Sequence, residues 1–424
     1  MIENVRNKIQ QYFISKTDFL TVKDKMNEDQ LRAFVIKTIN EVCIKEEIAL
    51  TDTERTALIK DLVRAVVTLG PIRPFMEDPS VSEVMINGPK QIYIQKAGRI
   101  ILTDAKFDDD RQLMDMIKKI LVDTGSGRRV DESFPYVDFS LSDGSRVNVI
   151  ISPVSLIGPV VTIRKFSSEI NKIEDLLVRK MLSQDMADFL VSAIHAKLNI
   201  VFCGATGTGK TTTLNVLSKY ISEEERIITI EDTAELQLIQ EHVVSLQTKA
   251  ANIEGKGMIT IRDLFINSLR MRPDRIIIGE VRSHEALDLI QAISSGHSGS
   301  LAIVHAESPK DCFNRLVTML LMSGIQLSVE EIRRQIASAI DIIVHTELFL
   351  DGTRKITHIT DVRHFEESNQ VTLEDVFFYH QERIDESGKV IGDWVVNKKK
   401  PSFYHKFVKR NIKLSEGFFD LSGE

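Results

Sequence analysis

The sequence contains few cysteines and no long apolar run, and each absence excludes a class of protein. Its 424 residues include three cysteines, Cys43, Cys203 and Cys312, whose spacing contains no CxxC pair and argues against a disulfide framework or a zinc site. No apolar run approaches the roughly 18 residues that a membrane-spanning helix needs. The N-terminus MIENVRNKIQ lacks the apolar region of a signal peptide. We therefore expect a cytoplasmic protein.

The sequence also lacks an excess of positive charge. Its 54 lysines and arginines are outnumbered by 61 aspartates and glutamates, and the formal net charge of −7 argues against a broad nucleic-acid surface. A local basic patch is still compatible with this balance. We find no internal repeat and no low-complexity tract. The content of 43% hydrophobic and 27% charged residues is typical of globular domains, and the length suggests two or three of them.

Helical spacing of apolar residues characterises the beginning of the chain. Residues 31–45 (LRAFVIKTINEVCIK) and 53–70 (TERTALIKDLVRAVVTLG) both place apolar residues at i, i+3 and i+4. The second segment ends at a Gly-Pro pair, which is a common stop signal for a helix. We predict a helical N-terminal region over residues 1–70.

The apolar spacing changes to two over residues 71–165, which favours strands. This part is predicted to contain hairpins over 92–104 and 136–152, an amphipathic helix over 110–123 and a last strand over 160–166. Together these elements predict a small α+β (PAS-like) domain. The segment that follows, residues 166–172, is polar and without periodicity, and we interpret it as a linker.

Strands and helices alternate after residue 173, in a predicted ATPase domain over 173–424. The predicted strands are 199–204, 226–232, 275–281 and 301–306, and the predicted helices are 183–198, 260–269, 283–293 and 311–321. Strands of almost unbroken apolar character, alternating with helices, indicate a parallel sheet that is covered on both faces. The last 80 or so residues return to antiparallel signals, with a hairpin over 342–360.

The stretch GATGTGKTT, residues 204–212, points to a phosphate ligand. It fits G-x4-GK[ST], in which glycines let several backbone N–H groups point at one anion. Lys210 would contact the β- and γ-phosphates and Thr211 would contact Mg²⁺, while the following helix adds its positive end. An apolar strand before the motif and helical spacing after it are the context that it requires. The predicted nucleotide-binding loop consists of Gly204, Ala205, Thr206, Gly207, Thr208, Gly209, Lys210, Thr211 and Thr212.

Polar side chains end three further apolar strands. Phosphoryl transfer needs a second carboxylate near the metal, a group that orients water, and cations for the developing charge. The candidates are Glu231, Asp232 and Glu235 after one strand, Glu280 and Arg282 after the next, and His305 at the end of a third, with His297 before that strand. Each residue alone has a structural explanation, such as a solvated strand end. Together, beside a phosphate loop, they predict a catalytic site.

Four motifs in sequence order resemble those of the secretion ATPase superfamily, whose members drive type II and type IV secretion and type IV pili. GATGTGKTT, IEDTAELQL, NSLRMRPDRIIIGEVR and SSGHSGSLAIVHA resemble its Walker A, Asp box, Walker B and His box. GRRVDESFPYVDFSLSDGSRVNVIISPVS, VVTIRKF and RIDESGKVIGDW resemble the branch of the tight-adherence (Tad/Flp, CpaF-type) pilus ATPases. The resemblance covers about residues 65–415. It implies an α/β fold with a RecA-like P-loop ATPase domain, preceded by the small α+β domain.

The resemblance also implies roles for individual residues. Glu280 matches the Walker B glutamate, and Glu235 matches the Asp-box carboxylate that acts as base for water. His305 matches a histidine that senses the γ-phosphate. Arg146 and Arg164 resemble arginines that the N-terminal domain brings to the nucleotide, commonly across a subunit boundary.

The cofactors implied by the resemblance are ATP and Mg²⁺, with Thr211 and Glu280 on the metal, the latter through water. The four-cysteine zinc insert of some members is absent from this chain. The resemblance further implies a homohexameric ring at the inner face of the cytoplasmic membrane, acting on a polytopic platform protein of the inner membrane.

Other functions compete with that of a pilus assembly motor. Within the motor class, the alternatives are a type IV secretion ATPase and a retraction motor. A ring translocase on nucleic acid would need a basic channel, and a scaffold that binds nucleotide without hydrolysis would show no turnover. The basic segment over residues 397–414 is open to two interpretations, a solvated helix face or a tail that docks on the membrane or on an acidic loop of the platform protein.

Overall fold

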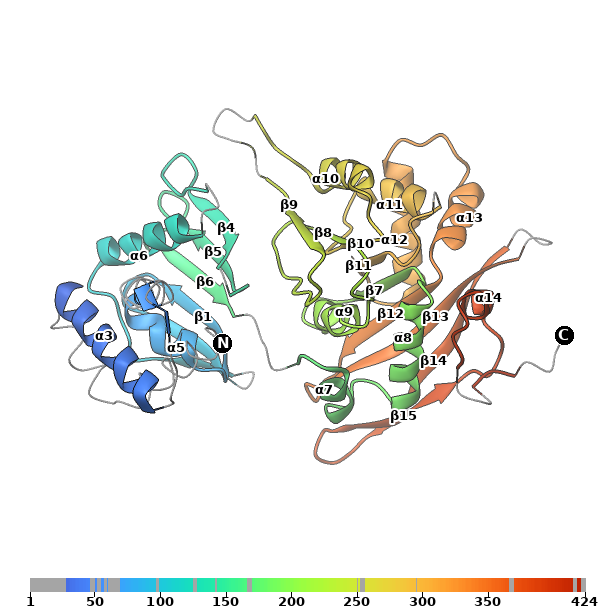
Figure 1. Ribbon diagram of the computed structural model, residues 1–424, viewed down its shortest axis with the longest axis horizontal. Helices are drawn as coiled ribbons and strands as arrows, with labels where there is room; N and C mark the ends of the chain where they lie inside the picture. Colours follow the sequence, from blue (N-terminus) through green and yellow to red (C-terminus); the bar gives the residue numbers. More distant parts are fainter. Residues whose placement is uncertain are drawn as a thin grey trace. The chain divides into compact units, whose positions relative to one another are not determined.

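The computed structural model describes two compact units, Met1–Ser167 and Ser168–Glu424 (Figure 1). The described residues are 28–45, 50–51, 55–56, 59, 69–96, 99–124, 128–141, 143–165, 170–249, 251, 256–294, 296–365, 370–414 and 418–420. The helix predicted over 53–70 lies largely outside them. The division between the units falls in the polar segment that we interpret as a linker, and the proposed domain limits stay a prediction.

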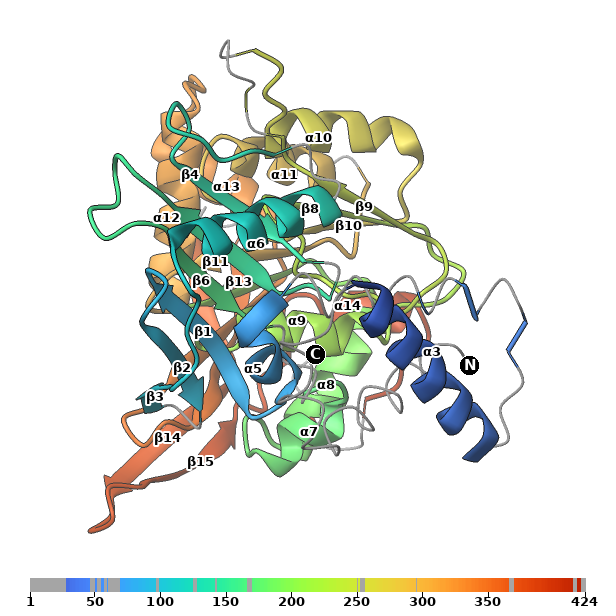
Figure 2. The same ribbon diagram turned by 90° about the vertical axis from the view of Figure 1, so that its left-hand side faces the viewer.

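The first unit contains a six-stranded antiparallel sheet with the strand order β3-β2-β1-β6-β5-β4 (Figure 2). Its strands are β1 (Val81–Asn87), β2 (Ile92–Lys96), β3 (Arg99–Leu102), β4 (Tyr136–Ser140), β5 (Arg146–Ile150) and β6 (Val160–Arg164). Its helices are α3 (Glu28–Lys45), η2 (Gly70–Ile72), α5 (Arg73–Glu77) and α6 (Asp110–Asp123). The predicted α+β character is confirmed, whereas strand β1 was not predicted.

Helix α6 forms where the sequence combines a cap with an amphipathic pattern. The Asp109 carboxylate accepts a hydrogen bond from the backbone N–H of Gln112 at 2.9 Å, which satisfies a donor of the first turn. Leu113, Ile117 and Ile120, spaced along one face, are at most 3% exposed and join the core under the sheet. Burial of each such side chain is worth about 1.5–3 kcal/mol, so packing on the sheet fixes the helix.

The second unit contains a nine-stranded sheet with the order β15-β14-β13-β12-β7-β11-β10-β8-β9. Its strands are β7 (Ile200–Gly204), β8 (Ile227–Glu231), β9 (Val243–Gln247), β10 (Arg275–Ile278), β11 (Leu301–His305), β12 (Ile342–Leu348), β13 (Arg354–Phe365), β14 (Gln370–Ile384) and β15 (Val390–Val396). The six strands from β12 to β9 are parallel, and β13 to β15 extend the sheet in antiparallel fashion. The predicted parallel sheet and the hairpin over 342–360 are confirmed.

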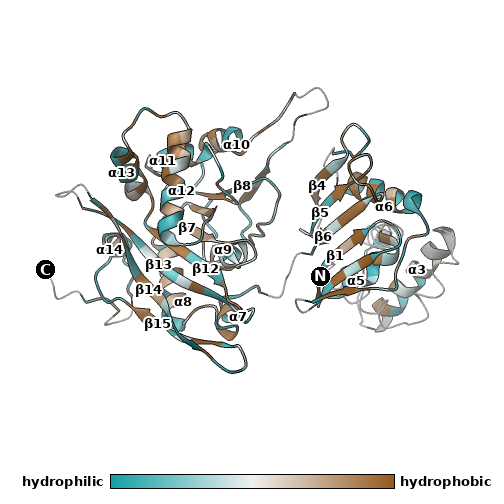
Figure 3. Cartoon of the chain, turned by 180° about the vertical axis from the view of Figure 1, so that it is seen from behind, coloured by the Kyte–Doolittle hydropathy of each residue, from teal (hydrophilic) through white to brown (hydrophobic). Residues whose placement is uncertain are grey.

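Helices cover both faces of this sheet. They are α7 (Ile173–Val178), α8 (Gln184–His195), α9 (Lys210–Ser218), α10 (Ile261–Ser268), η3 (Leu269–Met271), α11 (Glu285–Ser294), α12 (Pro309–Met322), α13 (Val329–Ala339) and α14 (Tyr404–Lys409). Side chains of α8 and α9 lie in the core of one face, and those of α10 to α13 in the core of the other. Strands β7 and β8 are buried at every position. Figure 3 shows hydrophobic segments, in brown, on strands of both units.

The basic segment over residues 397–414 is anchored in the second unit. Phe403 and Phe407 are each 1% exposed and belong to the core that α8 covers. Lys406 Nζ lies 2.7 Å and 2.8 Å from the two carboxylate oxygens of Asp341, directly before β12. The aromatic side chains of the segment are therefore part of the domain core, whereas Lys398, Lys399, Lys409 and Lys413 are exposed, as a solvated helix face requires. Docking on the membrane or on the platform protein stays a prediction. Deletion of the segment would remove core side chains and is no clean test of membrane recruitment.

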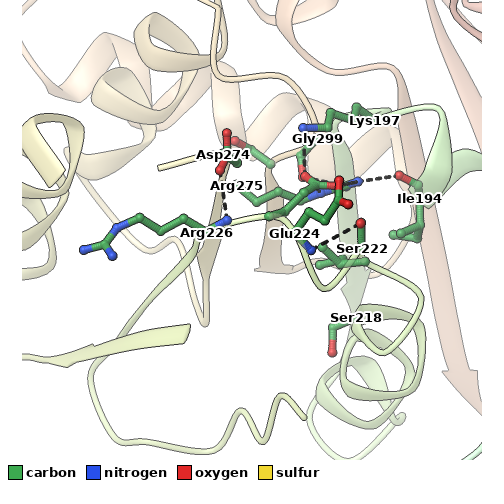
Figure 4. Close-up of polar contacts among 12 residues, drawn as sticks. Ile194, Lys197, Ser218, Ser222, Glu224, Arg226, Asp274, Arg275 and Gly299 are labelled. Carbon is green, nitrogen blue, oxygen red and sulfur yellow. Dashed lines mark hydrogen bonds and ion pairs between the residues drawn. The ribbon is translucent and has the colours of Figure 1, made fainter. Parts of the chain in front are cut away.

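A buried arginine holds together the edge of the sheet at which the parallel strands begin (Figure 4). Arg275, the first residue of β10, is 1% exposed, and its Nε lies 2.8 Å from a carboxylate oxygen of Glu225. Its terminal nitrogens donate to the carbonyls of Ile194 at 2.6 Å and Gly299 at 3.3 Å. Lys197 Nζ approaches the same carboxylate at 2.8 Å. This one side chain therefore connects the end of α8, the turn before β8 and the turn before β11.

We expect Arg275→Met to lower the free energy of unfolding of the second unit by about 3 kcal/mol, because the substitution leaves the buried carbonyls of Ile194 and Gly299 without this donor and leaves Glu225 with Lys197 as its remaining cation. Urea unfolding followed by the fluorescence of Trp394 measures this, since the single tryptophan of the chain lies on β15 in this unit. The matched control is Arg334→Met on the exposed surface of α13. Equal unfolding midpoints for the two variants would show that the Arg275 network contributes little.

No helix within the described residues has both the length and the apolar character that crossing a membrane would require.

Candidate active site

The phosphate loop connects β7 to α9 at the carboxyl end of the central strands. Its backbone needs glycine at two positions in particular. A Cβ atom on Gly204 would lie 2.3 Å from the carbonyl oxygen of Thr346, and the φ of Gly209, which caps α9, is 100°. Ala205 and Thr206 are exposed, and Thr211 and Thr212 are half-buried in the first turn of α9. The predicted context of strand, loop and helix is confirmed.

A buried threonine pair fixes the middle of the loop to the neighbouring strand. The hydroxyl of Thr208, which is 2% exposed, lies 2.9 Å from the hydroxyl of Thr346 on β12 and 2.9 Å from the carbonyl of Ala205. Thr346 also donates to the carbonyl of Cys203 at 3.2 Å. The loop is therefore shaped before any ligand arrives, which lowers the cost of ordering it on binding. Thr346 was not predicted, because it lies in a strand far away in sequence.

Lys210 lies inside the loop that precedes it. Its side chain is 6% exposed, and Nζ donates to the carbonyl of Ala205 at 2.7 Å. The same nitrogen lies 3.5 Å from Nδ1 of His305, the last residue of β11. The structure thus brings together two of the predicted site residues that are 95 positions apart. An ammonium group in this position can neutralise charge on phosphates that the loop binds.

Glu280 and Arg282, which follow β10, complete this group. Oε1 of Glu280 lies 3.3 Å from Nε2 of His305, and Oε2 lies 2.6 Å from a terminal nitrogen of Arg282. Arg282 also approaches Asp232 at 3.6 Å. Lys210, His305, Glu280 and Arg282 therefore form a continuous chain of polar contacts across the carboxyl ends of β7, β11 and β10.

The charge states in this chain follow from their neighbours. Burial raises the pKa of Glu280, but the hydrogen bond from Arg282 and the nearby His305 outweigh it, and the pKa is lowered overall. Burial and the positive charge of Lys210 lower the pKa of His305, although Glu280 acts in the opposite direction. At neutral pH the site therefore holds an ionised glutamate beside a neutral imidazole, which can still donate or accept a hydrogen bond.

The three Asp-box carboxylates lie in different environments. Glu231, which is 3% exposed at the end of β8, accepts hydrogen bonds from the backbone N–H groups of Glu235 and Leu236 at 2.8 Å and 3.0 Å. The two hydrogen bonds of Glu231 therefore fix the turn that carries Asp232 and Glu235. A Cβ atom on Gly279, the residue after β10, would lie 2.7 Å from the side chain of Glu231. The inward position of Glu231 therefore requires glycine at position 279. Asp232 and Glu235 are half-exposed.

The structure does not bring His297 together with these residues. His297 lies in the turn before β11, and its Nδ1 is 3.2 Å from the carbonyl of Ala292 at the end of α11. Because β11 is parallel to β7, this turn belongs to the edge opposite the phosphate loop. A role of His297 at the nucleotide stays a prediction without support from this placement.

Arg146 and Arg164 lie in the first unit, directly opposite each other on β5 and β6. Directly paired residues of an antiparallel sheet point to the same face with Cβ atoms about 4.5–5.5 Å apart. Arg164 also pairs with Glu83 on β1, at 3.9 Å between Nε and a carboxylate oxygen. Two positive charges on one face of a sheet form an arrangement that an oligophosphate can occupy.

The chemistry of the donors fits the cofactor that the motif implies. Mg²⁺ prefers oxygen ligands and is usually held by one or two protein groups together with phosphates and water. The hydroxyl of Thr211, in the first turn of α9, and the carboxylate of Glu280 are groups of this kind. The ammonium group of Lys210 would contact the phosphates themselves. The arrangement can therefore bind a metal nucleoside triphosphate and stabilise charge on the group transferred.

Comparisons with known proteins show relatives of this chain. The chain is 33% identical over 326 residues to the type IV secretion system protein VirB11 of Brucella suis, covering 69% of this chain and 88% of that protein. It is 31% identical over 343 residues to the VirB11 protein of Bartonella henselae, covering 71% of this chain and 94% of that protein. Both relatives therefore match nearly over their full lengths.

A solved structure agrees with the fold. The pilus retraction motor PilT with bound ADP matches 83% of this chain and 88% of its own, with 16% identity and a TM-score of 0.50. The RecA-like arrangement of the second unit is thus confirmed. The model of the family described as "Type II/IV secretion system protein" matches residues 66–382, three quarters of the chain. The chain belongs to this family of type II/IV secretion ATPases, and it is an ATP hydrolase of the P-loop class.

Proposed function

We propose that this chain is the subunit of a hexameric motor that drives assembly of a Tad/Flp pilus or a related secretion filament. It would work at the inner face of the cytoplasmic membrane on a polytopic platform protein. One observation carries the proposal of a motor. The phosphate loop and the catalytic candidates beside it belong to the second compact unit. The arginine pair of Arg146 and Arg164 belongs to the first unit. A ligand that attracts both groups changes how the two units are arranged.

The proposed roles within the site follow from its contacts. Lys210 would neutralise the β- and γ-phosphates, and Thr211 and Glu280 would hold Mg²⁺, which would supply further positive charge there. Asp232 or Glu235 orients the attacking water, because Glu231 is engaged with the backbone of the turn. His305 lies between Lys210 and Glu280 and would register whether a γ-phosphate is present. Loss of that phosphate on hydrolysis would release the arginine pair and complete the stroke.

Type IV secretion is the alternative that a specific observation favours. The Brucella and Bartonella relatives are both named as type IV secretion proteins. The Tad assignment is supported by the motif resemblance over residues 127–166 and by RIDESGKVIGDW. Genes next to this one distinguish the two proposals, because a pilus system requires pilin genes there. A nucleic-acid translocase is not favoured, since the net charge is −7.

Mixing two inactive variants tests whether the site is shared between subunits of a ring. We expect Arg146→Ala with Arg164→Ala, and separately Lys210→Ala, to lose most ATP turnover. A mixture of these two proteins should recover part of it, because some interfaces then pair an intact lysine with intact arginines of the neighbour. Released phosphate is measured while the mixing ratio is varied.

The control variant is Arg111→Ala on the exposed surface of α6, which should hydrolyse ATP at the wild-type rate. Sedimentation with ATP shows whether the mixture assembles. A mixture that assembles and stays inactive indicates either strict coupling of all sites in the ring or arginines that act within their own chain. Wild-type turnover in the double arginine variant contradicts their role altogether.

A further inference from the structure

An arginine outside all predicted motifs contacts the phosphate loop. Nε of Arg354, the first residue of β13, donates to the carbonyl oxygen of Gly207 at 2.7 Å, across 147 positions of sequence. We propose that Arg354 is a positioning residue of the nucleotide site, which holds the phosphate loop in its binding shape from the antiparallel extension of the sheet. This inference rests on the proposed binding of nucleotide at that loop.

The acceptor of this hydrogen bond explains how Arg354 would act. In a phosphate loop the backbone N–H groups point toward the anion, so the carbonyl groups point away from it. The carbonyl of Gly207 belongs to the same peptide group as the N–H of Thr208. A hydrogen-bond donor on that carbonyl polarises the peptide and strengthens its N–H as a donor. Arg354 therefore supports phosphate binding from the outer side of the loop without touching the ligand.

Both strands of the β12–β13 hairpin contact the loop at neighbouring residues. Thr346 on β12 contacts the hydroxyl of Thr208 at 2.9 Å, and Arg354 on β13 contacts the carbonyl of Gly207. The aliphatic part of Arg354 also lies against the start of α9, since a Cβ on Gly209 would be 3.6 Å from its Cδ. The hairpin thus fixes the loop at its middle and at its junction with the helix.

The hairpin that carries Arg354 is itself tied to the outer strand β15. Asp351 accepts hydrogen bonds from the backbone N–H of Thr353 and of Val390, both at 2.9 Å. Lys355 is 7% exposed, and its ammonium group lies 5.3 Å from the ring of Trp394 on β15. Arg354 therefore projects from a turn with fixed ends rather than from a mobile loop, as a positioning role requires.

Two substitutions separate the hydrogen bond from the charge. Glutamine carries its amide nitrogen the same number of bonds from Cα as Nε of arginine, so Arg354→Gln keeps the donor and loses the charge. Methionine has a side chain of the same length without a donor, so Arg354→Met loses both. The control is Arg383→Met on β14, where the side chain is 69% exposed and lies 4.0 Å from Glu382.

We expect Arg354→Met to bind ADP about three- to tenfold more weakly than the wild type, the loss of one net hydrogen bond. KM for ATP should rise by a similar factor with kcat changed less than about twofold. Arg354→Gln should restore most of the affinity, and Arg383→Met should bind like the wild type. Calorimetric titration with ADP measures the affinity at a temperature where Trp394 fluorescence reports every variant folded.

Wild-type affinity in Arg354→Met overturns the inference. Equal losses in Arg354→Gln and Arg354→Met also overturn it, because the charge rather than the donor would then matter. A lower kcat with unchanged KM would place Arg354 in the chemical step, contrary to a positioning role. Absence of ADP binding in the wild type itself would instead contradict the proposed nucleotide site, so the two failures are distinct.

Discussion

Replacing Lys210 with alanine is expected to abolish ATP hydrolysis and leave the fold intact. The ammonium group lies 2.7 Å from the carbonyl of Ala205 and 3.5 Å from His305, at the centre of the loop that would surround the phosphates. Its removal takes away the cation that neutralises the transferred group, and loss of one such group from a preorganised site costs about a hundredfold or more in rate. Phosphate release at saturating ATP measures the effect.

A lysine on the surface provides the matched control. Lys310→Ala, at an exposed position of α12, removes the same side chain where no phosphate is proposed to bind and should keep full turnover. Urea unfolding followed by Trp394 fluorescence shows whether Lys210→Ala remains folded. A folded Lys210→Ala protein with nearly normal turnover would end the assignment of residues 204–212 as the nucleotide loop.

The parts of the site that the sequence predicts are those encoded by local pattern. Gly204 to Thr211 form a single short motif. The strands that carry Glu280 and His305 can be predicted from their apolar runs. Parallel strands place their carboxyl ends at one edge of a sheet. The sequence alone therefore predicts that three separate strand ends share one site. The contact of His305 with both Lys210 and Glu280 agrees with that expectation.

The parts that the sequence could not predict depend on contacts between distant segments. Thr346 and Arg354 act on the loop only because β12 lies beside β7, and nothing in IIVHTEL or TRKITHI specifies that neighbour. The packing of the basic segment over residues 397–414 was missed for the same reason. Most of its lysines are exposed as expected, but Lys406 pairs with Asp341, and Phe403 and Phe407 belong to the core.

The sequence also could not show which of the three Asp-box carboxylates orients water. Glu231, Asp232 and Glu235 are three similar side chains in one short stretch, and only the backbone geometry distinguishes them. Glu231 is turned inward to bind two N–H groups of its own turn. A buried carboxylate engaged in this way shapes the site, and this leaves Asp232 and Glu235 as the candidates that orient water.

Glu280→Gln is expected to slow hydrolysis by about 10²–10³-fold, the range for removal of one electrostatic group from a preorganised site, and to retain ATP. The lowered pKa of Glu280 keeps it ionised at neutral pH, so the substitution removes a full negative charge. The amide preserves the shape and can still accept the hydrogen bond from Arg282, which lies 2.6 Å away. Binding and chemistry should therefore separate, with an affinity for ATP near that of the wild type and a much lower kcat.

The imidazole beside Glu280 offers a second observable for the same substitution. The carboxylate raises the pKa of His305 against the effects of burial and of Lys210, so the pKa of His305 should fall further in the variant. Titration of the His305 ring resonances by NMR measures that shift. Glu330→Gln, at an exposed position in the first turn of α13, is the matched control and should change neither turnover nor the histidine. A Glu280→Gln protein that no longer binds ATP would assign this carboxylate to the folding of the site, because catalysis alone cannot explain a loss of affinity.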